Sequence, residues 1–391
     1  MGSSCARPSF RSIALLHRCH VGSLPKVAGR YLTFLHIQGA AQLAGCERSC
    51  QVLIKQLKCA HHRVVVIGPD GPAVQAWKQS GAEVQVLDLG WSRHREFNAL
   101  RRLIAVSGAD GVILWTSSRL GLKIAACQAG GARRIVAHVG NPIRLAFRNS
   151  VAAELYTLLP RARQASLVAV SRHVARSYSG KSGFRHFRTN IVYNAIDTGH
   201  FLWDPLDGVP DNARVGMVAR LDSIKDHATL LRGWQLVAKA RPNWQLELAG
   251  DGPLREPLQA LASSLHISGS VNFLGWVKDV PQTMRRWSAV VHSTTAQEGL
   301  GNSMLEAMAM GRPLVATNVG PIAEVTDEGR VARLTRPGDH AGLAAQILQV
   351  AQEPARTREL MVSAQQWVTD RFSPQEMVTG YLRCLGLGGP D

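Results

Sequence analysis

The 391-residue sequence contains no long hydrophobic run and few cysteines. No stretch of about eighteen consecutive apolar residues is present, so the sequence predicts no transmembrane helix. The seven cysteines are an odd number at irregular spacings, which indicates reduced thiols in a cytosolic compartment rather than a disulfide framework. A chain of this length can bury two hydrophobic cores, and we expect two domains in a cytoplasmic protein.

The sequence also lacks Asp-x-Asp, a common metal-chelating pattern. One group of thiols and imidazoles could be imagined as a metal site: Cys46, Cys50, Cys59, His61 and His62. Cys46 and Cys50 share one face of a predicted helix, where thiols behave as small hydrophobic side chains. We therefore expect no metal ion and no cofactor.

Acidic residues are scarce in the first half of the chain. Residues 1–200 hold 27 Lys and Arg against 8 Asp and Glu, whereas residues 201–391 hold 18 against 20. A basic half beside a neutral half suggests an anionic partner for the first half. No zinc-finger, RNP or basic-helix pattern occurs, and no aromatic residues are interleaved with the positive charge, so we expect no nucleic acid.

An anionic membrane surface or a phosphate-bearing glycolipid fits this charge at least as well as nucleic acid does. Residues 143–163 carry arginines among apolar residues, a pattern that predicts an amphipathic helix on a membrane or over the acceptor cleft or, equally, an ordinary surface helix. Residues 1–30 are basic and free of acid, which indicates an extension of the folded protein or, alternatively, a transit peptide. An arginine-rich composition without function is the alternative reading of the whole charge excess.

Strand and helix patterns alternate along the chain. Apolar runs at residues 32–37, 62–68, 83–87 and 111–115 read as strands, and helical patterns lie between them. This alternation predicts a parallel, doubly wound sheet.

The stretch 289–317 reads as strand, loop, helix and strand. An apolar run at 289–292 precedes a polar loop at 293–301, a helix at 303–310 and a buried strand at 314–317. Asn302 is predicted to cap the helix N-terminus, Gly311 to take a positive φ at its end, and Pro313 to prevent its continuation.

Two carboxylates, Glu298 and Glu306, lie eight positions apart in this stretch. Both can face the carboxyl ends of the strands, where open α/β sheets bind ligands. Gly299 and Gly301 flank Leu300 and let a ligand approach the backbone closely. The alternative is an ordinary αβ unit with a solvated loop.

The pattern E-x7-E followed by Gly311-Arg312-Pro313 resembles the donor-sugar motif of the retaining glycosyltransferases of family four. The resemblance runs from about residue 32 to 385. It implies an α/β protein of the GT-B fold, with two Rossmann-like, doubly wound parallel-sheet domains facing each other across a cleft. It also implies that Glu298 holds the hydroxyls of the donor sugar and that Glu306 binds the nucleotide ribose.

Shorter segments extend the resemblance. Gly45-Cys46-Glu47-Arg48 is similar to the family's Gly-Gly-Ala-Glu-Arg turn, with Ala44 in place of the first glycine. His138 stands where the family places a histidine over the donor sugar, although a structural hydrogen bond is the alternative. Arg220 and Lys225 stand where the family binds the donor diphosphate.

The resemblance thus implies a complete donor site. Its implied catalytic residues are His138, Arg220, Lys225 and Glu298. Its implied donor-binding residues are Gly45, Gly250, Gly252, Val280, Gly299, Leu300, Gly301, Asn302 and Glu306.

The expected domains are a basic extension at 1–30, an acceptor-side domain at 31–198, a nucleotide-sugar domain at 199–370 and a C-terminal helix at 371–391 that returns to the first domain. The expected reaction moves a sugar from a nucleotide-diphosphate sugar to a hydroxyl of a saccharide or lipid-linked saccharide, with retention of configuration and without metal. Lipopolysaccharide, exopolysaccharide or glycolipid synthesis is the expected setting, at the inner face of a membrane. The alternatives are a sugar-nucleotide epimerase or phosphorylase of the same fold, or an inactive carbohydrate-binding or scaffold protein.

Overall fold

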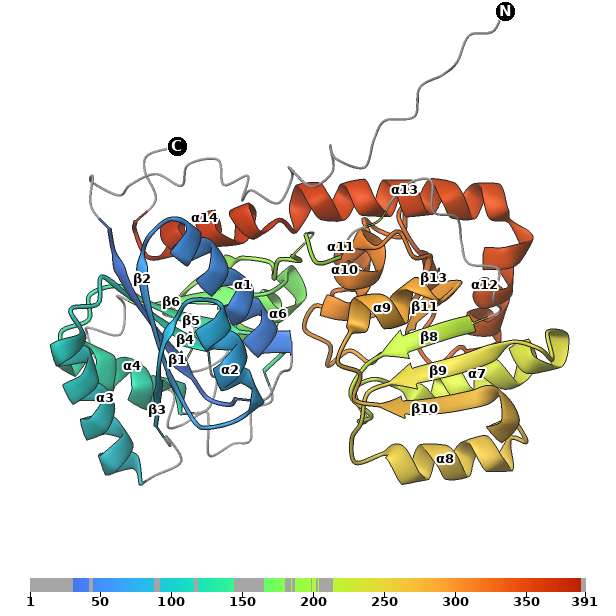
Figure 1. Ribbon diagram of the computed structural model, residues 1–391, viewed down its shortest axis with the longest axis horizontal. Coiled ribbons are helices and arrows are strands. Elements are labelled where there is room, and N and C mark those ends of the chain that lie inside the picture. The colour runs from blue at the N-terminus through green and yellow to red at the C-terminus, as the bar shows by residue number, and fades with distance from the viewer. Residues whose placement is uncertain are drawn as a thin grey trace, which may run out of the picture.

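The computed structural model describes residues 31–41, 45–87, 92–115, 119–143, 165–179, 184, 187–197, 199–201, 203 and 214–387. The predicted extension at 1–30, Ala44, and the predicted helix at 143–163 apart from Ile143 lie outside the described residues. The described residues form two α/β domains (Figure 1). Within them, no helix combines the length and apolarity that crossing a membrane requires.

The first domain is built on a parallel sheet with the strand order β3-β2-β1-β4-β5-β6-β7. The strands are β1 (Thr33–Gln38), β2 (Arg63–Gly68), β3 (Glu83–Val86), β4 (Gly111–Trp115), β5 (Ile135–Val139), β6 (Ala165–Ala169) and β7 (Arg188–Ile191). The four strands predicted from the apolar runs are confirmed. The strand order reverses direction between β1 and β4, the place where doubly wound sheets bind ligands.

Helices cover both faces of this sheet, so its central strands are apolar on both sides. The helices are α1 (Gly45–Cys59), α2 (Pro72–Gln79), α3 (Arg93–Ser107), α4 (Leu120–Ala129) and α6 (Arg172–Tyr178). Alternate residues of β1 point to opposite faces: Phe34 packs with α1 and α2, whereas Leu35 and Ile37 pack with α3, α4 and α6.

The second domain repeats the plan with the parallel strand order β10-β9-β8-β11-β12-β13. Its strands are β8 (Arg214–Val218), β9 (Gln245–Ala249), β10 (Val271–Gly275), β11 (Ala289–His292), β12 (Leu314–Thr317) and β13 (Arg333–Thr335). Its helices are α7 (His227–Ala240), α8 (Arg255–Ser264), α9 (Val280–Arg285), α10 (Asn302–Ala309), α11 (Ile322–Val325), α12 (His340–Gln352) and α13 (Pro354–Arg371). The strands predicted at 289–292 and 314–317 are confirmed, as is the positive φ of Gly311, which is 56°.

The last helix, α14 (Pro374–Cys384), leaves the second domain and lies over the first (Figure 1). The connection is fixed by a backbone hydrogen bond of 3.0 Å from Ile196 N to Phe372 O. Met377, Val378 and Leu382 of α14 are buried in the same core as α1 and α2. The first domain therefore takes part of its hydrophobic core from the end of the chain.

Tyr381 anchors α14 among aromatic rings of the first domain. Its hydroxyl lies 2.7 Å from His138 Nδ1, and the rings of Trp115 and His138 are 4.4 Å apart. Burial lowers the pKa of His138 to about 3, so the imidazole is neutral at physiological pH.

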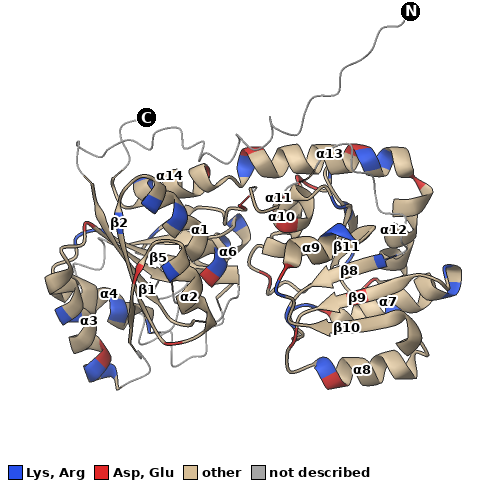
Figure 2. Cartoon of the chain, viewed as in Figure 1, with Lys and Arg blue, Asp and Glu red and all other residues tan. Residues whose placement is uncertain are grey.

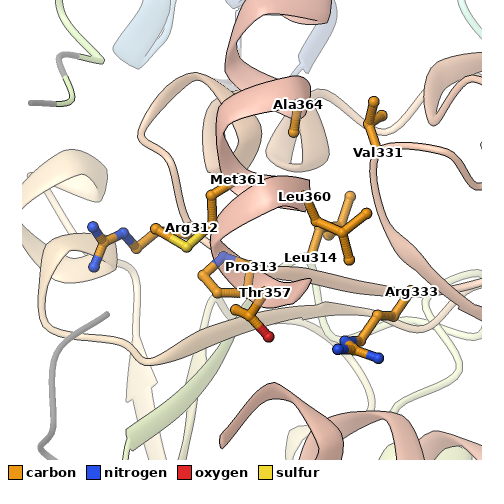
Figure 3. Close-up of a pocket in the computed structure, with 9 residues that line it drawn as sticks. All are labelled: Arg312, Pro313, Leu314, Val331, Arg333, Thr357, Leu360, Met361 and Ala364. Carbon is orange, nitrogen blue, oxygen red and sulfur yellow. The ribbon is translucent and has the colours of Figure 1, made fainter. Parts of the chain in front are cut away.

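A cavity of the described residues lies under α13, against β12 and β13 (Figure 3). Leu314, Leu360 and Met361 form apolar walls, and Arg312 and Arg333 lie on opposite sides. The cavity measures about 10 Å³, which is far below the usual range of ligand pockets. We assign it to packing between α13 and the sheet.

We expect Tyr381→Phe to lower the free energy of unfolding by about 1–3 kcal/mol, because the buried His138 Nδ1 loses its hydrogen-bond partner while the ring packing remains. Urea denaturation measures the change. Tyr178→Phe is the matched control, because Tyr178 is also buried and its hydroxyl has no hydrogen-bond partner among the described residues. Equal losses in the two variants would contradict the anchoring role of Tyr381.

Candidate functional site

The carboxyl edges of the two sheets meet at the N-termini of α1 and α10. Asn302 Nδ2 donates to Gly45 O at 3.2 Å, and Asn302 Oδ1 accepts from Asn194 Nδ2 at 2.9 Å. The prediction that Asn302 caps α10 is wrong. Gly301 takes the N-cap position with a φ of 89°, which is why the Asn302 side chain is available for the opposite domain.

The loop between β11 and α10 touches the first domain through its backbone. A Cβ atom at Gly299 would lie 1.7 Å from Gly140 O, so no side chain fits at this position. Ser171 Oγ donates to Gly299 O at 2.7 Å and accepts from Val174 N at the start of α6. Leu300, the next residue, is buried in the core. Gly299 thus brings the Glu298 carboxylate to the domain junction.

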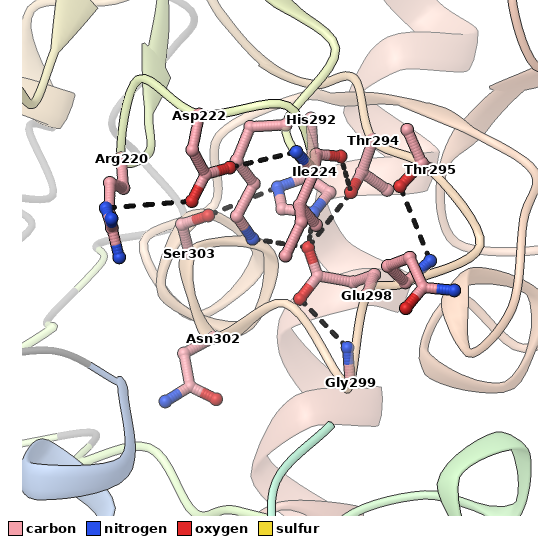
Figure 4. A network of polar contacts seen from close by, with 12 residues as sticks. Arg220, Asp222, Ile224, His292, Thr294, Thr295, Glu298, Gly299, Asn302 and Ser303 are labelled. Carbon is pink, nitrogen blue, oxygen red and sulfur yellow. Dashed lines mark hydrogen bonds and ion pairs between the residues drawn. The ribbon is translucent and has the colours of Figure 1, made fainter. Parts of the chain in front are cut away.

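Glu298 is the centre of a buried polar network (Figure 4). Its Oε2 forms an ion pair with the Lys225 ammonium. The same oxygen lies within hydrogen-bond distance of His292 Nε2, at 3.2 Å, and of Thr294 Oγ1, at 3.1 Å. Its Oε1 accepts from Gly299 N at 3.1 Å. The strand β11, the loop after β8 and the residue after Glu298 therefore converge on one carboxylate.

Burial alone would raise the pKa of Glu298, but the Lys225 ammonium and the hydrogen bond from His292 hold this pKa well below its usual range. The carboxylate is therefore ionised at every physiological pH. A buried, fixed negative charge can accept hydrogen bonds from ligand hydroxyls.

The loop after β8 carries the two predicted diphosphate ligands. The side chain of Arg220 is 64% exposed, and its Nε lies 3.7 Å from Asp222 Oδ2. The Lys225 ammonium is paired with the Glu298 carboxylate. Hydrogen bonds from Thr295 N and Thr294 Oγ1 to Ile224 O tie this loop to the loop of Glu298. The structure thus brings Lys225 directly to Glu298. Arg220 lies at the exposed start of the same loop (Figure 4).

Glu306 lies on α10 and reaches across the junction to Arg48 of α1, with 3.4 Å between Oε1 and Nη1. Burial raises the pKa of Glu306 to about 7, and Arg48 offsets only part of that rise. Because the folded protein holds this proton between about pH 4.5 and 7 while the unfolded chain releases it, Glu306 lowers stability as pH rises through that range.

Three predicted donor-binding residues have structural roles in the second domain. A Cβ atom at Gly250 would lie 1.9 Å from Ala219 O, and one at Gly252 would lie 2.4 Å from Leu221 O. These glycines therefore let the loop after β9 pack against the loop that carries Arg220. Val280 is buried in the first turn of α9. Donor contacts of these three residues stay predictions.

His138 lies in a different environment from Glu298. It lies on β5 beneath α14, buried, with Nδ1 bonded to Tyr381 and with Nε2 lacking a hydrogen-bond partner in the described residues. The structural hydrogen bond named as the alternative reading is therefore present. A role of His138 at the reacting carbon stays a prediction.

The sequence interpretation missed His292, Ser171 and Asn194. His292 ends an otherwise apolar strand at the carboxyl edge of the sheet, and a polar residue at that place is the signal that could have identified it. Ser171 and Asn194 act across the junction, which no local pattern reveals. No group of three or more metal-ligating side chains occurs within the described residues.

Comparison with known proteins agrees with this architecture. Residues 212–353 match the model of the family described as "Glycosyl transferases group 1". The chain carries a group 1 glycosyltransferase domain. The matched range contains β8 to α12, and with them Arg220, Lys225, Glu298 and Glu306.

Two curated relatives of this glycosyltransferase domain are enzymes of bacteria. The lipopolysaccharide core biosynthesis glycosyltransferase LpsD of Rhizobium meliloti is 32% identical over 175 residues, which cover 44% of this chain and 49% of LpsD. N-acetyl-alpha-D-glucosaminyl L-malate synthase of Bacillus anthracis is 33% identical over 137 residues, 35% of this chain and 36% of that enzyme. The alignments thus span less than half the length of these relatives.

The crystal structure of HepE from Anabaena, in complex with UDP and glucose, superposes with a TM-score of 0.77 at 22% identity, covering 91% of this chain and 100% of HepE. This likeness extends over both domains. The chain has the GT-B fold, as the sequence resemblance implied.

We expect Arg48→Met to move the titration midpoint of Glu306 above about 7, because Arg48 lowers that pKa. If Glu306 binds ribose, the affinity for UDP should rise with pH as the carboxylate ionises, and this rise should occur at higher pH in the variant. Calorimetric titration with UDP from pH 6 to 9, with GDP and ADP as parallel ligands, measures the shift. Glu306→Gln is the control and should keep only the pH dependence that comes from the terminal phosphate of UDP, which titrates near about pH 6. An unshifted midpoint in Arg48→Met would contradict the coupling.

Proposed function

We propose that this protein transfers a sugar from a nucleotide-diphosphate sugar to a hydroxyl of an acceptor, with retention of configuration. The observation that carries the proposal is the ionised carboxylate of Glu298, held by Lys225 at the carboxyl edge of the sheet within the matched family range. The structure of HepE with UDP and glucose supports a nucleotide sugar as donor.

Lys225, Arg220 and the N-terminus of α10 would hold the donor diphosphate. The bond to the leaving phosphate breaks with a gain of negative charge on its oxygens, so fixed positive groups stabilise the transition state more than the ground state. A helix N-terminus adds partial positive charge from its free N–H groups. We propose that these groups suffice without a divalent metal ion.

Glu298 would accept hydrogen bonds from the donor sugar, and Glu306 would accept them from the ribose. The leaving phosphate would act as the base that takes the proton of the acceptor hydroxyl on the same face of the sugar, which retains configuration. The relationship to LpsD supports a saccharide or a lipid-linked saccharide as the acceptor, in the synthesis of a bacterial surface polysaccharide or glycolipid.

Donor hydrolysis tests the proposal, because a transferase slowly transfers its sugar to water. We expect one of UDP-glucose, UDP-galactose, UDP-N-acetylglucosamine, GDP-mannose and ADP-glucose to be hydrolysed in EDTA. Activity only after addition of Mg²⁺ or Mn²⁺ would overturn the metal-free diphosphate site. Isomerised sugar instead of hydrolysis would indicate an epimerase.

Lys225→Ala should lower turnover roughly a hundredfold to a thousandfold, the usual loss on removing one preorganised charge that stabilises a transition state. Donor affinity should fall less, because the ground state carries less charge on the leaving oxygens. Steady-state kinetics with the hydrolysed donor measures both. Lys239→Ala, at the exposed end of α7, is the matched control; near-normal turnover in a folded Lys225→Ala protein would show that Lys225 does not hold the diphosphate.

We also propose that the first domain associates with an anionic membrane surface. Arg101 and Arg102 lie exposed just past the middle of α3, and Arg133 and Arg134 lie exposed before β5. The turn at Gly130, three residues before Arg133, packs against the backbone of Arg101. Val106, on the next turn of α3, is 82% exposed. Figure 2 shows the charges of the described residues along the chain.

Vesicle sedimentation tests this surface. Replacing Arg101, Arg102, Arg133 and Arg134 with glutamine should reduce binding to vesicles that contain phosphatidylglycerol, and binding of the wild type should weaken as salt rises. The matched control replaces four exposed arginines of the second domain, Arg232, Arg241, Arg285 and Arg336. Equal binding of the wild type to neutral and anionic vesicles at low salt would refute the proposal.

A further inference from the structure

His292 is a buried imidazole at the centre of the site. It is the last residue of β11 and is 1% exposed. Its Nε2 lies 3.2 Å from Glu298 Oε2, and its Nδ1 lies 3.3 Å from the hydroxyl of Ser303 in the first turn of α10 (Figure 4). Gly301 leaves the room for this ring, because a Cβ atom there would lie 3.1 Å from Nε2.

The surroundings of His292 select one tautomer. Burial and the Lys225 ammonium lower the pKa of His292, and the Glu298 carboxylate offsets only part of this effect, so the ring is neutral at physiological pH. A neutral imidazole has one N–H group and one lone pair. With the proton on Nε2, the ring donates to the carboxylate and accepts from Ser303. With the proton on Nδ1, the Nε2 lone pair would face the negative charge of Glu298, which is repulsive.

The two oxygens of Glu298 are used unequally. Three donors surround Oε2: the Lys225 ammonium, His292 Nε2 and Thr294 Oγ1. Oε1 accepts from Gly299 N, at the point where the backbone meets the first domain. A carboxylate oxygen accepts about two hydrogen bonds, so the protein saturates Oε2 and leaves acceptor capacity on Oε1.

Of the three donors to Oε2, His292 is the one whose single N–H group points at this oxygen. The Thr294 hydroxyl also lies 3.0 Å from Ile224 O and can donate its single hydrogen to that carbonyl instead. The Lys225 ammonium sits on a flexible stem and carries further protons, which our proposed function assigns to the diphosphate. The imidazole has a rigid ring, a single N–H group and a position fixed by the strand.

We infer that His292 is a positioning residue that prevents rotation of Glu298, so that only Oε1 is presented to the hydroxyls of the donor sugar. This inference rests on the proposed function and adds how the site selects its sugar. A fixed acceptor discriminates between sugars that differ in the configuration of one hydroxyl, because the wrong epimer leaves a buried carboxylate oxygen without a partner. A carboxylate that can rotate follows the hydroxyl and loses that discrimination.

A pair of amide substitutions separates positioning from mere packing. His292→Gln places an N–H donor near the position of Nε2, whereas the shorter His292→Asn replaces only the Nδ1 side of the ring. The measurement is the ratio of kcat/KM for hydrolysis of UDP-glucose and its epimer UDP-galactose, or of GDP-mannose and GDP-glucose if the wild type uses GDP sugars. Affinity for UDP or GDP alone, which carry no sugar, is measured alongside by calorimetry.

We expect His292→Asn to lower the epimer ratio about tenfold to a hundredfold, corresponding to the loss of one hydrogen bond to a charged group. His292→Gln should keep the ratio within about threefold of the wild type, and both variants should bind the free nucleotide as the wild type does. Ser303→Ala, which removes the partner of Nδ1 without touching the core, should lower the ratio in the same direction by a smaller factor.

Two results would overturn the inference in different ways. If the wild type discriminates between epimers and both His292→Asn and Ser303→Ala discriminate equally well, Glu298 is positioned without His292 and the proposed function stands. If the wild type neither binds UDP, GDP or ADP nor hydrolyses any of their sugars, the proposed function is wrong and the inference falls with it.

Discussion

The organising constraint of this protein is a buried negative charge at the edge of a parallel sheet. An ionised carboxylate inside a protein must be paired and hydrogen-bonded, or it becomes protonated. Glu298 meets this requirement with the Lys225 ammonium, the His292 imidazole and its neighbouring backbone N–H. The loop after β8 must therefore lie against the loop after β11. This contact gathers the polar side chains of the candidate site at the carboxyl edge of the second sheet.

The same loop joins the two domains. Gly299 places its backbone against Gly140, and Asn302 connects the N-termini of α1 and α10. The strand-to-helix turns of both sheets thus converge, and each brings the partial positive charge of a helix N-terminus to the junction. Since α14 contributes to the core of the first domain, the C-terminal part of the chain also holds the two domains together.

The pKa values of two carboxylates eight residues apart are shifted in opposite directions. Glu298 has a full ammonium partner and a low pKa, whereas Glu306 faces Arg48 at 3.4 Å and keeps a pKa of about 7. Both are buried, so the difference comes from the distance and number of their donors. The first is a permanent acceptor, and the second changes its charge near physiological pH.

Local sequence determined much of this protein. Apolar runs bounded by glycine and proline specified the strands at 289–292 and 314–317 and the parallel α/β fold, because periodicity and backbone freedom are local properties. The eight-residue spacing identified Glu298 and Glu306. Only the tertiary structure decided that Asn302 binds the opposite domain instead of capping its helix, that His138 packs under Tyr381, and that His292 holds Glu298. These contacts join residues distant in the chain, and no local pattern encodes which buried donor meets which acceptor.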